Sequence, residues 1–145
     1  HFVWSLTANA LILVGKLATV VICWVTDITD WFTVDLRTLK EYCVKRRIPL
    51  IEDAAQSLGS YYNKTPSGKL GDISTLSFAP SKPLPCFGNG GMVLTDSETD
   101  RDFVRGLRYH GHGTAKLHHG YNSCLSNDHA NILTKRLHFK IEKII

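Results

Sequence analysis

Lys82 stands in a stretch rich in proline and glycine, "SFAPSKPLPCFGNGGMVLTD", which covers residues 77–96. Pro80, Pro83 and Pro85 stiffen the backbone on both sides of it. Lysine is a good helix former, and surface lysines usually lie on helices. A lysine in a proline-bounded loop is therefore either an incidental surface side chain or an amine that the loop positions for chemistry.

Asp53 is a second candidate, because it ends the apolar run "IPLIED" (48–53), where burial would penalise an unpaired carboxylate. One interpretation is that Asp53 caps a helix over "AAQSLG". The other is that it pairs with the cationic ring nitrogen of a bound cofactor. Pyridoxal phosphate (PLP) needs such an acid, an amine such as that of Lys82, and polar donors for its phosphate. Taken alone, each residue favours the structural interpretation.

Three further motifs are less specific. The "GNGG" segment (88–91) lacks the spacing of nucleotide-binding glycine motifs and predicts a turn before "MVLTD". The histidines of "HGHG" (110–113) and "HH" (118–119) have no matching cysteine or carboxylate set, so we expect no metal site. Ser77 lacks a nucleophile elbow, and it either donates to a phosphate or lines a strand.

The elements that must position these side chains follow from the periodicity of apolar residues. Compact apolar runs predict strands over 19–26, 48–53, 71–80 and 91–96. Helical spacing predicts helices over 34–47 with Asp35 as N-cap, from Ser97 to Gly111 or Gly113, and over 127–144, with irregular backbone over 114–126. This order predicts an α/β domain with a mainly parallel sheet and flanking helices, whose sites lie beyond the carboxyl ends of the strands.

Composition is that of one globular domain. The chain has 145 residues, 43% hydrophobic and 21% charged, so it can bury a core. The net charge of +4 is scattered, apart from "KRR" (45–47), which argues against a nucleic-acid partner. Four cysteines without ligand-like spacing predict free thiols in a reducing compartment. The N-terminal apolar run is too short for a membrane span and no signal-peptide pattern precedes it, so we expect a cytoplasmic protein.

Several blocks of the sequence resemble the DegT/DnrJ/EryC1/StrS family of PLP-dependent sugar aminotransferases. The blocks "IPLIEDAAQSLGS", "GDISTLSFAPSKPLPCFGNGGMVLTD", "LRYHGHG" and "GYNSCLS" occur in the order and spacing of that family, between about residues 34 and 137. The N-terminal "FVWSLTANALILVG" is also similar to a family segment. The resemblance implies the large-domain fold of aspartate aminotransferase type I.

The resemblance also implies a role for five residues. Lys82 matches the lysine that binds the cofactor covalently and later moves a proton between substrate and cofactor. Asp53 matches the acid that keeps the pyridine nitrogen protonated, and Gln56 the glutamine against the PLP ring and its hydroxyl. Ser77 matches a phosphate-binding serine. Asn122 matches an asparagine that reaches the phosphate from the neighbouring subunit. Some relatives carry histidine at the lysine position and act as dehydratases, so Lys82 favours transamination.

For the whole protein, the resemblance implies amino transfer from glutamate to a keto-sugar, usually nucleotide-linked, in a homodimer with its active site at the interface. Residues 1–145 would be an incomplete PLP-binding large domain, without the N-terminal phosphate-binding turn and the C-terminal small domain. Cys124 stands where the family usually has arginine, and Ser126 where aspartate is common. A non-catalytic remnant that acts only as a binding or structural protein is the alternative. A truncated sheet would leave apolar surface and strand edges uncovered, so we expect self-association.

Overall fold

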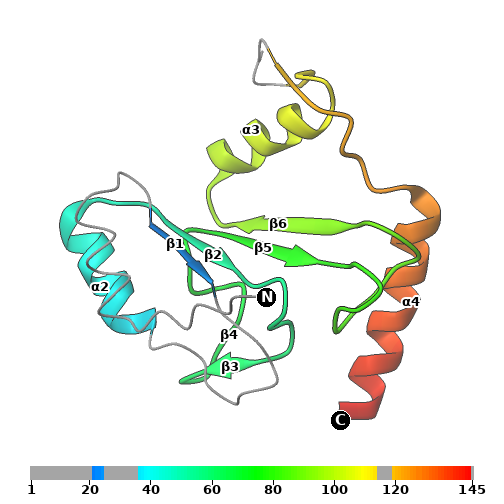
Figure 1. Ribbon diagram of the computed structural model, residues 1–145, viewed down its shortest axis with the longest axis horizontal. Coiled ribbons are helices and arrows are strands. Elements are labelled where there is room, and N and C mark those ends of the chain that lie inside the picture. The colour runs from blue at the N-terminus through cyan, green and yellow to red at the C-terminus, as the bar shows by residue number, and fades with distance from the viewer. Residues whose placement is uncertain (1–20, 25–35, 114–118, 145) are drawn as a thin grey trace. The chain divides into compact units, whose positions relative to one another are not determined.

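The computed structural model describes residues 21–24, 36–113 and 119–144 (Figure 1). The chain forms two compact units, His1–Leu76 and Ser77–Ile145.

The first unit is built on three parallel strands. They lie in the order β1 (Val21–Trp24), β2 (Leu50–Asp53) and β5 (Ile73–Ser77). The register pairs Trp24 with Asp53 and Asp53 with Thr75, so the carboxyl ends of β1 and β2 meet at one edge. The predicted mainly parallel sheet is therefore confirmed for these strands. Of the strand predicted over 19–26, residues 21–24 are described and the others lie outside the described residues.

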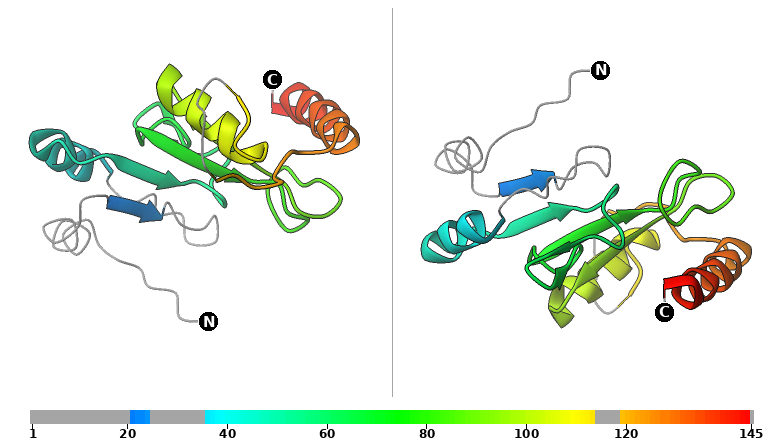
Figure 2. Two further views of the ribbon diagram at one scale, coloured as in Figure 1. Left: turned by 90° about the horizontal axis from the view of Figure 1, so that it is seen from above. Right: turned by 90° about the horizontal axis from the view of Figure 1, so that it is seen from below.

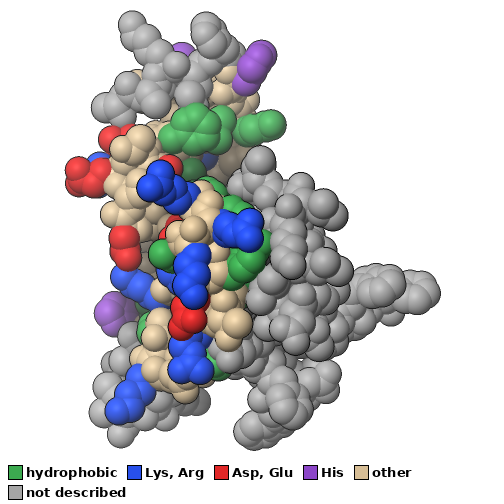
Figure 3. Space-filling model, turned by 90° about the vertical axis from the view of Figure 1, so that its left-hand side faces the viewer, with side chains coloured by type: hydrophobic (Ala, Val, Ile, Leu, Met, Phe, Trp, Pro, Cys, Tyr) green, Lys and Arg blue, Asp and Glu red, His purple; other side chains and the backbone are tan. Residues whose placement is uncertain are grey.

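The chain between β1 and β2 forms helix α2 (Leu36–Arg46). Leu39 and Cys43 lie four residues apart on its inner face and are fully buried. Burial raises the pKa of the Cys43 thiol, and the nearby Asp72 charge raises it further, so this thiol stays protonated at neutral pH. Lys and Arg side chains gather along the outer face of α2 (Figure 3). The predicted N-cap, Asp35, lies outside the described residues.

A short hairpin follows β2 and was not predicted. Strand β3 (Tyr61–Tyr62) pairs antiparallel with β4 (Thr65–Pro66). The two turn residues, Asn63 and Lys64, both have positive φ, at 45° and 68°, as a two-residue hairpin turn requires. Each strand has only two residues, which is too short to produce an alternating apolar pattern.

The second unit contains one strand and two helices. Strand β6 (Gly91–Thr95) leads into α3 (Glu98–Arg108), whose N-cap is Ser97 as predicted. The helix ends at Arg108, before the two glycines predicted to end it, although the Gly111 N–H still donates to the Gly106 carbonyl. Helix α4 (Asn127–Ile144) confirms the last predicted helix (Figure 2). Within the described part of the chain, no helix has both the length and the apolar character that a membrane crossing requires.

Candidate functional site

Asp53 is the last residue of β2, at the carboxyl edge of the parallel strands. Its side chain is half-buried. Its Oδ1 accepts a hydrogen bond from the Ala55 N–H at 3.1 Å and one from the Thr75 hydroxyl at 3.4 Å. Among the described residues, both hydrogen bonds to the carboxylate fall on Oδ1. Oδ2 is the oxygen that this arrangement leaves for a ligand.

The helix N-cap interpretation of Asp53 is wrong. Residues 54–60 form successive turns and no helix, and Asp53 caps the first of these turns through Ala55. Gln56 lies in this same turn, three residues after Asp53, and is half-buried. The first unit therefore brings two of the five predicted residues, Asp53 and Gln56, together immediately beyond a strand end.

Glu52, next to Asp53, is a residue that the sequence analysis did not single out. Its side chain has no exposed surface. The carboxylate accepts five hydrogen bonds, at 2.7–3.2 Å, from the backbone N–H groups of Gly68, Leu70 and Gly71 and from the hydroxyls of Ser67 and Ser74. These donors replace the water that a buried carboxylate loses. Glu52 thus fixes the segment that leads into β5.

Strand periodicity is the signal that could have identified Glu52. Side chains alternate between the two faces of a strand, and Leu50 and Glu52 are the buried residues of β2. A glutamate in phase with a buried leucine must find donors inside the protein. Asp53, out of phase with both, is directed away from that cluster of donors.

Ser77, the last residue of β5, begins the second unit, and Lys82 follows it in the same unit. The Ser77 Oγ accepts a hydrogen bond from the Ala79 N–H at 3.3 Å, so its own hydroxyl proton remains available for a ligand. The Lys82 N–H donates to the Ala79 carbonyl at 2.9 Å, which closes a turn of residues 79–82 with Pro80 at its second position. The second position of such a turn favours proline, because the proline ring already holds the φ angle that this position requires. Lys82 itself is half-buried.

The turn belongs to a longer segment, residues 78–90, which we call the Lys82 loop. Phe78 closes the neck of the loop, because its N–H donates to the Gly90 carbonyl at 2.8 Å and its carbonyl accepts from the Cys86 N–H at 2.7 Å. Leu84 and Cys86 are buried and hold the loop from inside. At the predicted "GNGG" turn the backbone bends at Phe87 and Gly88, with Gly88 at a φ of 107°, before β6 begins at Gly91. Lys82 is therefore held by backbone that has few alternative conformations.

Asn122 lies elsewhere in the second unit, in extended backbone beside the end of α3. It forms an isolated antiparallel bridge with Tyr109 and is exposed. Cys124, at the position usually occupied by arginine, is also exposed, and its thiol donates to the Arg108 carbonyl at 3.6 Å. Both side chains are thus on the surface of this chain.

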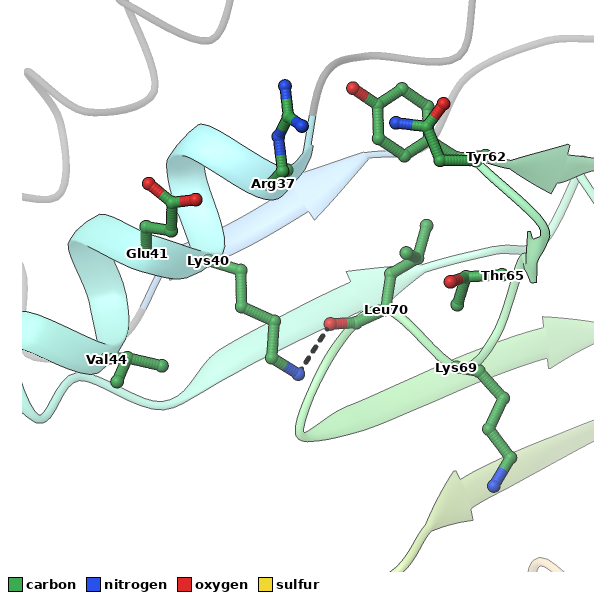
Figure 4. Close-up of a pocket in the computed structure, with 9 residues that line it drawn as sticks. Arg37, Lys40, Glu41, Val44, Tyr62, Thr65, Lys69 and Leu70 are labelled. Carbon is green, nitrogen blue, oxygen red and sulfur yellow. Dashed lines mark hydrogen bonds between the residues drawn. The ribbon is translucent and has the colours of Figure 1, made fainter.

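A hollow of about 420 Å³ lies in the first unit, between α2 and the hairpin (Figure 4). Arg37, Lys40 and Lys69 contribute positive charge to it, but these residues already have partners. Lys40, for example, donates to the Leu70 carbonyl at 2.8 Å. None of the five predicted residues lines this hollow.

Together, the five residues offer an amine, a half-buried carboxylate, a hydroxyl and two side-chain amides. This donor set fits PLP, which needs a nucleophilic amine, an acid for its ring nitrogen and donors for its phosphate. Among the described residues, no group of three or more His, Cys, Asp or Glu side chains could hold a metal ion.

Comparison with known proteins supports this chemistry. The sequence profile of the DegT/DnrJ/EryC1/StrS aminotransferase family matches residues 19–145. The UDP-2-acetamido-2-deoxy-3-oxo-D-glucuronate aminotransferase of Pseudomonas aeruginosa is 37% identical over 113 residues, which cover 76% of this chain and 31% of that protein. The UDP-N-acetyl-3-dehydro-alpha-D-glucosamine 3-aminotransferase of Acidithiobacillus ferrooxidans is 43% identical over 103 residues, which cover 68% of this chain and 27% of that protein. The chain thus spans less than a third of these relatives' lengths.

Solved structures show the same likeness. The aminotransferase TlmJ from Streptoalloteichus hindustanus matches with a TM-score of 0.76 and 26% identity, over 91% of this chain and 36% of that one. The ntda protein from Bacillus subtilis, solved with bound cofactor PMP, matches with a TM-score of 0.63 and 31% identity. The match covers 70% of this chain and 24% of that one. These similarities confirm the predicted fold class, the α/β architecture of PLP-dependent aminotransferases.

Proposed function

Because the chain belongs to the DegT/DnrJ/EryC1/StrS aminotransferase family, we propose that it is part of a PLP-dependent enzyme that transfers an amino group from glutamate to a nucleotide-linked keto-sugar. Relatives named as transaminases of UDP-linked and dTDP-linked sugars support the substrate class. Residues 1–145 would be part of the PLP-binding large domain, and the intact protein would act in the cytoplasm.

PLP, when bound, supplies an aldehyde and an electron-accepting ring that carry the amino group between the two substrates. Lys82 would hold the cofactor through its amine and would later move a proton between the substrate and the cofactor. The Asp53 carboxylate would keep a proton on the ring nitrogen, and the Gln56 amide would lie against the ring. The Ser77 hydroxyl would donate to the phosphate.

The Lys82 loop is the observation that carries this proposal. Ala79 links the two residues, because its N–H donates to the Ser77 hydroxyl and its carbonyl accepts from the Lys82 N–H, so a phosphate donor and a nucleophile come from one short segment. A catalytic amine gains more from being held in place than from being made more reactive. An incidental surface lysine would not need a loop closed by backbone hydrogen bonds on both sides of Phe78.

A second copy of the chain would complete the site. Asn122 is exposed, as expected for a side chain that reaches the phosphate of a neighbouring subunit. Cys124 lacks the charge of the usual arginine, so the cross-subunit phosphate contact would be weaker than in most relatives.

The first test is the visible absorbance of the chain with added PLP, measured beside Lys82→Ala and Lys135→Ala. Lys135 is an exposed lysine of α4 and serves as the matched control. We expect a lysine-dependent absorbance band in the wild type and in Lys135→Ala, and none in Lys82→Ala. Borohydride reduction and peptide mass spectrometry should locate the adduct at Lys82. A band that Lys82→Ala retains would contradict the proposal and favour the non-catalytic remnant.

A further inference from the structure

We propose that Arg136 of α4 is a positioning residue that holds the Lys82 loop in the conformation that presents the lysine amine; the inference rests on the proposed function of Lys82. The Arg136 Nη1 donates to the Pro85 carbonyl at 2.6 Å, although the two residues are 51 positions apart in the sequence. The same guanidinium lies over the Phe87 ring, with its carbon 5.3 Å from the ring centroid. One side chain thus contacts two residues of the loop.

The carbonyl groups of the Lys82 loop need hydrogen-bond donors from elsewhere in the chain, because the loop is rich in proline. Pro83 and Pro85 have no N–H, and the irregular backbone around them forms no ladder that would pair their carbonyls. Arg136 supplies a donor to Pro85, and the Lys140 Nζ, one helical turn further on, donates to Pro83. Both contacts lie within three residues of Lys82, on its C-terminal side.

The spacing on α4 shows that one face of the helix serves this contact. Leu133, Arg136 and Lys140 follow each other at three and four residues, which places them on one helix face. Leu133 is the buried residue of α4 among those described. Burial of Leu133 thus fixes the rotation of α4 about its axis, and the Arg136 and Lys140 side chains on the same face then contact the Lys82 loop.

Two local effects combine at Lys82. The turn through Ala79 holds the N-terminal side of the lysine, and Arg136 and Lys140 hold the C-terminal side. Removing the Arg136 guanidinium should loosen the C-terminal side, where only the Lys140 contact to Pro83 remains, and so weaken the turn that the Lys82 N–H closes. The amine would then sample more positions, and bond formation with an aldehyde would slow, because fewer conformers are productive.

The test compares Arg136→Met, which keeps the aliphatic stem, with Arg136→Lys and with Arg105→Met, an exposed arginine of α3 in the same unit. The first readout needs no cofactor: amide hydrogen exchange at Lys82 and Cys86, whose N–H groups close the loop. We expect exchange about tenfold faster at both amides in Arg136→Met. Arg136→Lys should fall between Arg136→Met and the wild type, and Arg105→Met should match the wild type.

The second readout is the rate at which PLP labels Lys82, trapped by borohydride. We expect labelling to slow about tenfold in Arg136→Met. Unchanged loop exchange in Arg136→Met, or an increase that extends equally over α3 and α4, would overturn the proposal. Faster loop exchange with unchanged labelling would also overturn it, because the loop contact would then be purely structural. If the wild type took no label at Lys82, the proposed function would fail, while the exchange data would still decide whether Arg136 holds the loop.

Discussion

At the scale of single residues, the two carboxylates that end β2 have opposite environments. Glu52 is fully buried and accepts five hydrogen bonds, whereas Asp53 is half-buried and accepts two on one oxygen. Alternation along the strand is the physical cause, because neighbouring side chains face opposite sides. The first carboxylate is therefore committed to the fold, and the second remains available to a ligand.

Glu52→Gln should lower the free energy of unfolding by about 3 kcal/mol. The amide group of glutamine would direct its own N–H atoms at backbone N–H donors, which leaves at least one donor unsatisfied. The measurement is urea denaturation monitored by circular dichroism. Glu41→Gln, on the exposed face of α2, is the control and should stay within about 0.5 kcal/mol of the wild type. Equal stability of the two variants would show that the buried charge contributes little.

At the scale of elements, α3 shows how local sequence sets a boundary. The Ser97 Oγ accepts a hydrogen bond from the Asp100 N–H at 3.2 Å, and Glu98 and Asp100 place negative charge in the first turn. Both features stabilise the helix start without help from the rest of the protein. The Lys82 loop is the opposite case, since α4 supplies two of its hydrogen bonds.

Ser97→Ala should therefore cost about 1 kcal/mol of stability, because the alanine side chain cannot accept the Asp100 N–H. Ser97→Asp should retain most of the stability, since a carboxylate also caps a helix. Thermal unfolding of the three proteins at one concentration checks the order. A Ser97→Ala protein as stable as Ser97→Asp would mean that water caps this exposed helix end equally well.

At the scale of the whole molecule, the chain exposes many large apolar side chains. Tyr109, which forms the bridge with Asn122, and Tyr121, which precedes Asn122 in the sequence, are 57% and 68% exposed. Such residues are enriched in protein interfaces, where their rings are buried. Because Asn122 is proposed to reach a neighbouring subunit, we expect the surface around it to be covered by a second copy.

Sedimentation velocity at several concentrations should show self-association of the chain. Tyr121→Asp should weaken it by about tenfold or more, because a charge would be buried at the interface. Tyr61→Asp is the matched control, since Tyr61 is 66% exposed but lies in the hairpin of the first unit. A monodisperse monomer, or equal weakening by the two substitutions, would be inconsistent with an interface around Asn122.

Much of the fold could be predicted from the sequence alone. The α/β class, the strands β1, β2, β5 and β6, the start of α3 at Ser97 and the extent of α4 follow from apolar periodicity and capping, which act between residues close in the sequence. Residue type and position singled out Lys82, Asp53 and Ser77, whereas Gln56 and Asn122 came from the resemblance in short blocks. The roles of all five stay predictions. Periodicity did not reveal the hairpin over 61–66, because its strands are too short.

Only the tertiary structure decided which polar groups meet. The donors to Glu52 come from residues 67–74, and the donor to Pro85 comes from Arg136, 51 positions away. The Thr75 hydroxyl likewise reaches Asp53 from the neighbouring strand, 22 positions away. Sequence patterns report the conformational preference of neighbouring residues, whereas these contacts depend on where whole segments pack. A buried carboxylate or an unpaired carbonyl can be anticipated locally, but its partner is chosen by the fold.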